Sequence, residues 1–125
     1  MLDNYCAGFI AKSEENYKLY ELLKKQNSFI EWQVVAIFYS ALCYAKAYLY
    51  KKGIGINCIN SHDSIKFYLG NETQAKQSNV LTPYLNLYRN SRDARYTNKK
   101  FNIARLENIL KDYKTVIKFL KENYC

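Results

Sequence analysis

Hydrophobic residues occur on every side of the segment from residue 29 to residue 52, FIEWQVVAIFYSALCYAKAYLYKK. The segment contains neither Gly nor Pro, and Ser28 before it is a favourable N-cap, so we predict one continuous helix. A helix that is apolar nearly all round is buried by several neighbours, by a second subunit or by lipid. Polar residues that would be costly in a bilayer interrupt the run at Glu31, Gln33, Ser40 and Lys46. We therefore predict the central helix of a soluble bundle, with one face left for a second copy of the chain.

The residues before this segment predict the first arm of a helical hairpin. Residues 1–12 are expected to be a ragged lead-in. Ser13 is expected to cap a helix that ends near residue 26, because acidic residues follow it at the positive end of the helix dipole. Asn27 and Ser28 then form a very short turn. Because short connections join antiparallel neighbours, the first two helices are expected to pack as a hairpin.

The residues after the central helix alternate between breaking signals and short helical segments. Residues 53–55, Gly-Ile-Gly, end the central helix, and Ser61 is expected to cap a third helix that ends at residue 69. Residues 70–79 are polar and are predicted to form the most mobile loop of the chain. The Thr82-Pro83 pair predicts the start of a fourth helix over residues 84–96, since Pro is favoured at the first helical position.

The last helix, predicted over residues 99–124, has the clearest periodicity. Its apolar residues recur at steps of three and four: Ile103, Leu106, Leu110, Tyr113, Ile117, Leu120 and Tyr124. Four lysines fall on the opposite side, where we expect water: Lys111, Lys114, Lys118 and Lys121. The pattern predicts an all-α protein, a four- to five-helix up-down bundle with a long central helix, in one domain over residues 1–125.

Composition agrees with this reading and narrows the chemistry. One Pro and four Gly suit helices joined by short turns, and the 13 Tyr favour a contact surface. The four cysteines, Cys6, Cys43, Cys58 and Cys125, lack the spacing of a zinc site. No secretory signal or lipidation motif is visible, so we expect free thiols in the cytoplasm, no membrane association, no metal and no cofactor.

Positive charge is concentrated in the last third of the chain. The formal net charge is +8, and from Arg89 onward ten Lys or Arg stand against four Asp or Glu. Such a basic region is the electrostatic signature of a phosphate partner, in nucleic acid or on an anionic surface. The alternative is a solvated basic face that only keeps the protein in solution.

The strongest candidate site is the octapeptide RNSRDARY at residues 89–96, which is expected to end the fourth helix. Arg89, Arg92 and Tyr96 fall near one face of that helix, because seven residues make about two turns. Arginine binds phosphate oxygens in pairs, and a tyrosine can stack on a base. The candidate phosphate contacts from charge are Arg89, Arg92, Arg95, Lys99 and Lys100. Alternatively, Asp93 and the carbonyls at the helix end pair these arginines for stability alone.

The helix order, the segment YSALCYAKAYL, the SHDS cap and the ending YLNLYRNSRDARY together resemble HEPN-domain proteins. These are helical-bundle domains of bacterial and archaeal toxin–antitoxin and phage-defence systems, usually dimeric and often directed at RNA. Ribonuclease members carry R-N-x-x-x-H-x-Y. This chain matches the motif at Arg89, Asn90 and Tyr96 and has Ala94 where the His should stand. The resemblance therefore implies Arg89, Asn90 and Tyr96 as RNA contacts in a groove shared by two subunits, without the motif's proton-transfer residue.

The missing His leaves three functional hypotheses. The preferred one is a HEPN-like homodimer that binds RNA, an antitoxin or another protein partner and has weakened or absent ribonuclease activity. In the second, the chain is an active, metal-independent ribonuclease toxin that uses Arg89, Arg92, Arg95 and Tyr96, with His62, the only His, in place of the missing base. In the third, it is a structural adaptor that does not bind nucleic acid.

Overall fold

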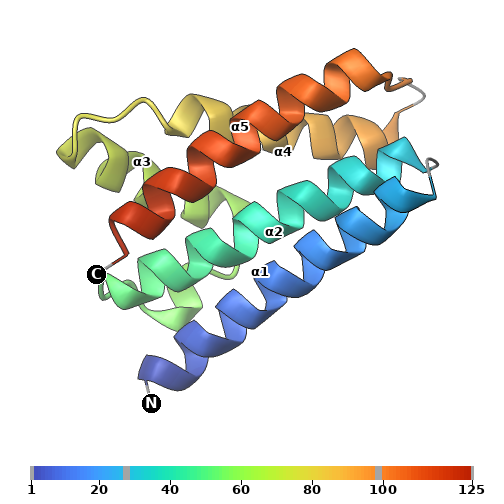
Figure 1. Cartoon of the computed structure of the whole chain (residues 1–125). Helices are drawn as coiled ribbons and strands as arrows, with labels where there is room; N and C mark the ends of the chain where they lie inside the picture. Colours follow the sequence, from blue (N-terminus) through green and yellow to red (C-terminus); the bar gives the residue numbers. More distant parts are fainter. Residues whose placement is uncertain (1, 27–28, 98–99, 125) are drawn as a thin grey trace.

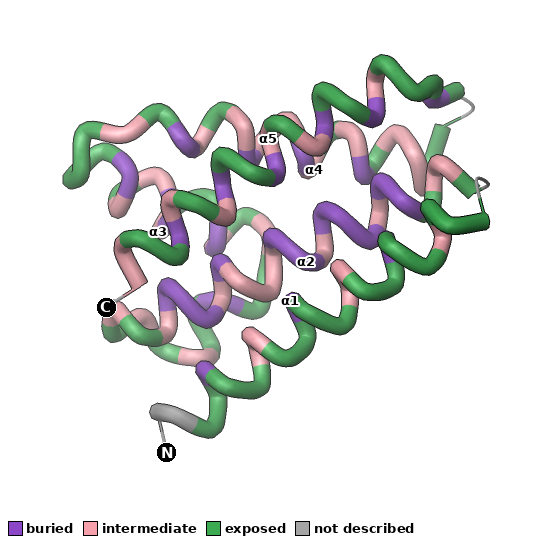
Figure 2. The backbone as a smooth tube through the Cα atoms, in the orientation of Figure 1, coloured by how far each residue is buried: buried purple, intermediate pink, exposed green. Residues whose placement is uncertain are grey.

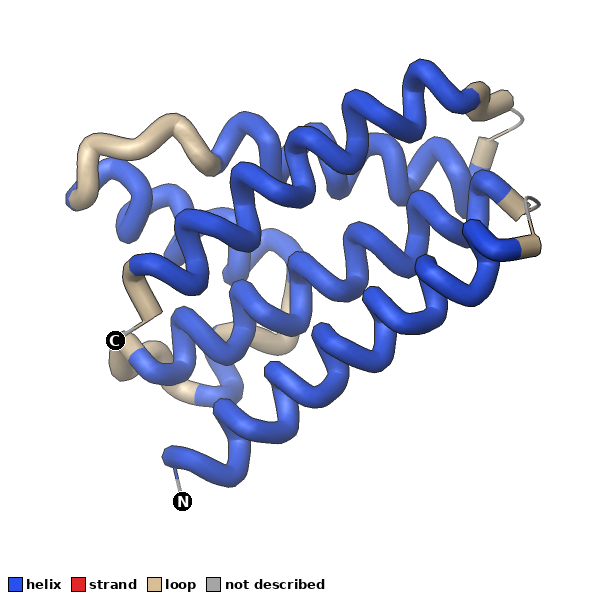
Figure 3. The backbone as a smooth tube through the Cα atoms, viewed as in Figure 1, coloured by secondary structure: helices blue, strands red, loops and turns tan. Residues whose placement is uncertain are grey.

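The computed structural model describes residues 2–26, 29–97 and 100–124. Within these ranges the chain is all-α, as predicted, and contains no strand (Figures 1 and 3). The elements in chain order are α1 (Leu2–Lys25), α2 (Ile30–Lys51), the short 3-10 helix η1 (Ile56–Cys58), α3 (His62–Ala75), α4 (Leu81–Tyr96) and α5 (Ile103–Glu122). None of the helices in these ranges is both long and apolar enough to cross a membrane.

Helix α2 is the centre of the bundle and packs against all four other α-helices (Figure 1). Ile37, Ala41 and Tyr48 are completely buried, and buried positions follow α2 along its whole length (Figure 2). Helix α1 runs antiparallel to α2 and covers one side of it, whereas α4 and α5 cover the other (Figure 1). The prediction of a central helix surrounded by its neighbours is therefore confirmed. The predicted cap at Ser28 and turn at Asn27 lie outside the described residues.

The expected lead-in over residues 1–12 is wrong, because α1 already begins at Leu2. Cys6 is buried and its thiol lies 3.8 Å from the carbonyl oxygen of Ala47 on α2. Ser13 is no N-cap but lies inside α1, where its buried hydroxyl donates to the carbonyl oxygen of Ser40 at 2.7 Å. Packing along α2 thus makes these residues helical, a tertiary effect that the local capping pattern does not contain.

The third helix begins as predicted and ends later than predicted. The Ser61 hydroxyl accepts from the amide of Ser64 at 3.2 Å, which confirms the cap. Helix α3 then continues through Gly70 to Ala75, so the loop predicted from residue 70 starts too early. The extension is held by Tyr48, whose buried hydroxyl donates to Glu72 at 2.9 Å. Because Tyr48 belongs to α2, the polarity of residues 70–79 alone could not predict where α3 ends.

The last two helices differ from their predictions mainly at their starts. Helix α4 begins at Leu81, one turn before the predicted residue, and ends at Tyr96 as expected. Helix α5 begins at Ile103, where Asn102 accepts from the amide of Arg105 at 2.8 Å. The predicted start at Lys99 lies outside the described residues. The four lysines expected to face water, Lys111, Lys114, Lys118 and Lys121, are exposed.

The inward stripe of α5 is rotated slightly from the predicted one. Ile103 is 55% exposed, whereas Ile109 and Val116 are buried. Cys6, Cys43 and Cys58 are free thiols, as expected, and Cys125 lies outside the described residues.

Candidate functional site

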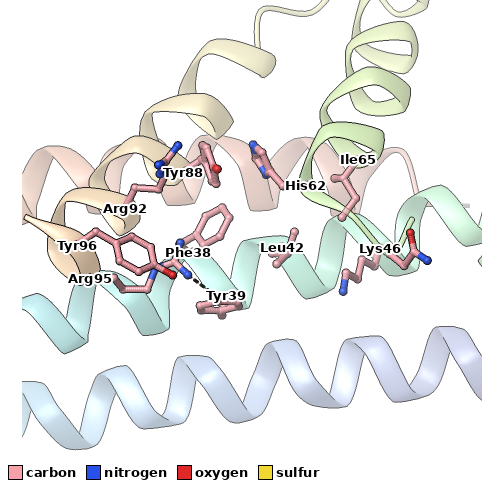
Figure 4. A pocket seen from close by; sticks show the side chains of 11 residues that line it. Phe38, Tyr39, Leu42, Lys46, His62, Ile65, Tyr88, Arg92, Arg95 and Tyr96 are labelled. Carbon is pink, nitrogen blue, oxygen red and sulfur yellow. Dashed lines mark hydrogen bonds between the residues drawn. The ribbon is translucent and has the colours of Figure 1, made fainter. Parts of the chain in front are cut away.

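A pocket of about 560 Å³ opens where α2, α3 and α4 meet (Figure 4). Its walls combine five aromatic or imidazole rings with three cationic side chains and a few aliphatic and polar groups. The lining residues are Phe38, Tyr39, Leu42, Lys46, Asn60, His62, Ile65, Tyr88, Arg92, Arg95 and Tyr96. Its volume lies in the range of sites that hold a small molecule or one unit of a polymer. In Figure 4 the α2 side chains form one side of the pocket and the α4 side chains the other.

Helical periodicity explains how α4 and α2 supply these residues. Tyr88, Arg92 and Arg95 follow one another at steps of four and three, so they project from one side of α4. Tyr39 and Lys46, seven residues apart, project from one side of α2 in the same way. His62 is the first residue of α3, placed there because Ser61 caps the helix. Three separate helices therefore converge on the pocket.

The His62 imidazole lies flat against the ring of Tyr88, with 3.4 Å between ring centres and 12° between planes. Among the described residues, nothing hydrogen-bonds to its buried Nδ1 atom. Burial lowers the pKa of His62 below 6.5, and the positive charges of Lys66, Arg92 and Arg95 lower it further, against an opposing effect of Asp63. The ring is therefore neutral at pH 7 and has an unsatisfied nitrogen.

Arg95 is held in position by aromatic neighbours. Its Nη1 donates to the hydroxyl of Tyr39 at 2.9 Å, drawn as a dashed line in Figure 4, and its Nε donates to the carbonyl oxygen of Ser91 at 3.3 Å. The guanidinium also lies 5.0 Å from the ring centre of Tyr96. No carboxylate within the described ranges neutralises it. Its charge is thus positioned and remains available to an anion.

Arg92 is exposed and less constrained than Arg95. Its guanidinium lies 5.8 Å from the ring centre of Tyr88, the ring on which His62 stacks. The described part of the chain offers it no ion pair. Arg92 can therefore turn toward a ligand without breaking a bond that supports the fold.

A second cavity, of about 380 Å³, adjoins the first and is lined by residues of α3 and α4. Its own lining residues are Asp63, Lys66, Leu85 and Arg89, and it shares three residues with the first pocket: His62, Tyr88 and Arg92. The Nη2 atom of Arg89 donates to the side-chain oxygen of Asn86, which orients the guanidinium along α4. The shared residues thus form a wall with cationic groups on both sides.

Asn90 and Lys100, which were also predicted to contact phosphate or RNA, line neither cavity. Asn90 is half-buried, donates to the carbonyl oxygen of Asn86 at 2.8 Å and accepts from Nε of Arg105 at 2.9 Å, so both ends of its amide are occupied. Asp93 accepts from Arg105 at 3.0 Å, which makes Arg105 its partner rather than Arg92. Lys100 is exposed and lines neither cavity. Lys99 lies outside the described residues.

Sequence reasoning missed the aromatic part of the site. Tyr39 and Tyr88 are not among the predicted site residues, and Lys46 was named only as a polar interruption of the central helix. A signal did exist for Tyr88, because it precedes Arg92 by one helical turn and therefore shares its side of α4. No local pattern could have found the stacking of His62 on Tyr88, which joins two helices.

The chemistry of the pocket suits an anion attached to a planar group. Arginines and Lys46 offer charge-assisted hydrogen bonds, and the rings offer faces for stacking. Within the described ranges, no three His, Cys, Asp or Glu side chains come together as a metal site. Comparisons with protein-family models, with curated proteins and with solved structures found no match for this chain. The case for a function therefore rests on the pocket itself.

Proposed function

We propose that this chain is a HEPN-like, dimeric domain that binds RNA in the pocket between α2, α3 and α4 and has weakened or absent ribonuclease activity. One observation carries the proposal: Arg92 and Arg95 stand beside aromatic rings in one open pocket, with no acid of the described chain paired to them. Phosphate would bind the guanidiniums, and a base would stack on an exposed ring such as Tyr96, which is 71% exposed. A toxin–antitoxin or phage-defence role follows from the resemblance.

The arginine pair gives the direct test. In the double variant Arg92→Ala/Arg95→Ala, RNA affinity should fall at least roughly tenfold, and the dependence of affinity on salt should become shallower by about two phosphate contacts. Affinity would be measured by fluorescence anisotropy with a labelled single-stranded RNA at several salt concentrations. An unlabelled DNA strand of the same sequence, used as competitor, reports the preference for RNA.

A matched control removes the same charge from another surface. Lys111 and Lys114 are exposed on α5 and line neither cavity, so Lys111→Ala/Lys114→Ala should change affinity only slightly. Equal losses in the two double variants would mean that only net charge attracts RNA. Affinity that does not fall as salt rises would exclude a phosphate site and favour the structural adaptor.

A second candidate, an active ribonuclease, is favoured by the position of His62. The imidazole lines the same pocket as Arg92 and Arg95 and is neutral at pH 7, and because Nδ1 is buried it could act as a base only through Nε2. Such a group could accept the proton of a ribose 2′-hydroxyl as its oxygen attacks the adjacent phosphorus and the 5′-oxygen leaves. Incubation with RNA in the presence of a chelator separates the candidates. Cleavage that His62→Gln reduces by roughly two to four orders of magnitude would establish the second.

The proposed dimer has a candidate face on α2. Trp32 is 61% exposed, and Val35 and Tyr39 follow it along the same side of the helix toward the pocket. A second copy that packs there would bring its own pocket close to the first. Light scattering should give the mass of a dimer for the natural chain and of a monomer for Trp32→Glu. A strict monomer in both cases would contradict this part of the proposal and leave a protein partner as the alternative occupant.

A further inference from the structure

The two adjoining cavities carry separate sets of cations. The first has Arg95 and Lys46 of its own, and the second has Arg89 and Lys66. Arg92 belongs to both, at the wall that they share. A single phosphate in the first cavity would leave the cations of the second without a partner.

We infer that the two cavities form one groove for two consecutive phosphates of a single strand, one on each side of the wall made by His62 and Tyr88. This inference rests on the proposed function and specifies its ligand as an oligonucleotide rather than a mononucleotide. Arg95 would hold the first phosphate and Arg89 and Lys66 the second, with Arg92 between them, whereas Lys46 lies at the opposite end of the first cavity from Arg95 (Figure 4). Nucleic-acid strands suit such an arrangement, because their phosphates are joined by short flexible links and their bases can stack on the rings of the groove.

The wall between the cavities is a stack of side chains from three helices. His62 stacks on Tyr88 at 3.4 Å, and the Arg92 guanidinium lies 5.8 Å from the same ring. Phe38 supports the stack from below, with its ring centre 5.7 Å from that of Tyr88. A phosphate could not pass through these layered groups, so a ligand that occupies both cavities must cross over them. A flexible chain with charges at intervals can do so, whereas one compact anion cannot.

The two phosphate positions are not equivalent, because Asp63 lines the second cavity and not the first. Its carboxylate repels an anion beside Arg89 and Lys66, which makes the second position the weaker one. The same carboxylate can accept a hydrogen bond from a ribose hydroxyl or a base amino group of the ligand. The first cavity is therefore expected to bind a ligand with a single phosphate. The second is expected to provide the additional affinity of longer strands.

Calorimetry at constant ionic strength tests the inference with a series of 5′-phosphorylated oligouridines of one, two and three nucleotides. These ligands carry one, two and three phosphates. For the natural chain, affinity should rise roughly tenfold from one phosphate to two, as one charge-assisted contact adds, and by less than about threefold from two to three. In Arg89→Ala the gain in affinity from the one-phosphate to the two-phosphate ligand should fall below about threefold, while affinity for the single-phosphate ligand stays the same. In Arg95→Ala affinity should fall for every ligand of the series.

Two further variants sharpen the result. Asp63→Asn removes the repulsion and should enlarge the step from one phosphate to two, whereas Glu107→Gln, an exposed acid of α5 that lines neither cavity, should leave it unchanged. Circular dichroism of each variant verifies that the fold is retained. An increase of affinity at every step, unaffected by Arg89→Ala, would overturn the inference, since it would mean charge attraction without defined positions.

The outcomes for the inference and for the proposed function can be told apart. If the single-phosphate ligand and the longer ligands all fail to bind, the phosphate site itself is wrong. If the single-phosphate ligand binds through Arg95 and no step follows, only the two-phosphate groove is wrong. A glutamate peptide of matched charge that binds as tightly as the three-phosphate ligand would assign the groove to an acidic protein segment and overturn the inference.

Discussion

Two regions of this bundle contain polar side chains, and they differ in whether these side chains are bonded to one another. Between α1, α2 and α5, the hydroxyls of Ser13, Ser40 and Tyr113 are buried and bonded to one another, with 2.8 Å between Ser40 and Tyr113. In the pocket between α2, α3 and α4, Arg92 and Arg95 have no acidic partner in the described chain. A closed polar network holds helices in register, whereas an open one leaves interaction energy for a ligand. The first region also lines a cavity, of about 290 Å³, but its hydroxyls are bonded to one another, so the comparison favours the second region for binding an anion.

The largest expected effect follows from breaking the closed network. Ser40→Ala leaves the buried hydroxyl of Tyr113 without its partner, whereas Ser13 keeps its bond to the backbone carbonyl oxygen of residue 40, and the loss should cost about 1–3 kcal/mol of unfolding free energy. Chemical denaturation followed by circular dichroism measures this change. RNA binding at the open pocket should be unaffected once the protein is folded.

Ser91→Ala is the control for this variant. Ser91 is also completely buried, but its hydroxyl has no hydrogen-bond partner in the described chain. Its removal should leave stability nearly unchanged or slightly higher, because it abolishes an unsatisfied group. If Ser40→Ala proves as neutral as Ser91→Ala, the closed network does not stabilise the fold and the contrast between the regions fails.

The next effect concerns the open pocket. Tyr96→Ala should weaken RNA binding by roughly five- to a hundredfold through loss of a stacking surface, while Tyr96→Phe should bind like the natural chain. Neither variant should change stability much, because the side chain is 71% exposed. Anisotropy titrations and thermal melts measure the two properties separately. A loss of stability without a loss of affinity would mean that Tyr96 stabilises the fold and does not bind RNA.

The smallest effect is a dependence of stability on pH that comes from His62. The folded protein lowers the pKa of His62, so below about pH 6.5 the unfolded chain binds more protons than the folded one. Stability should therefore decrease as pH falls through the range from about 7 to 5.5, and His62→Gln should flatten this decrease. Melting temperatures across that range test it. An unchanged slope in His62→Gln would mean that other groups cause the dependence.

Much of the fold could be predicted from local sequence. The continuous central helix α2, the cap at Ser61 and the end of α4 at Tyr96 are properties of one helix at a time, and the structure has them as expected, whereas the buried stripe of α5 agrees only in part. The sharing of one pocket by Arg92, Arg95 and Tyr96 could also be anticipated, since helical spacing alone brings them near one another.

What escaped prediction depends on pairs of helices. Ser13 has the appearance of an N-cap, yet it serves as a hydrogen-bond donor to Ser40, 27 residues further along the chain. Asn90 belongs to the motif-like octapeptide, yet its amide is bound to Arg105 of α5. His62 was considered only as a substitute base, and its stacking on Tyr88 of α4 joins two helices.

The sequence by itself determined most of the helical segments, most of their apolar sides and where positive charge is concentrated. Only the tertiary structure decided that residues 2–12 and 70–75 are helical and which polar side chains bond to one another. The physical reason is that helix formation depends on neighbours within about four residues, whereas hydrogen bonding between helices depends on their packing. The candidate site is a product of that packing, because it joins one residue of α3 to the arginines of α4 and the rings of α2.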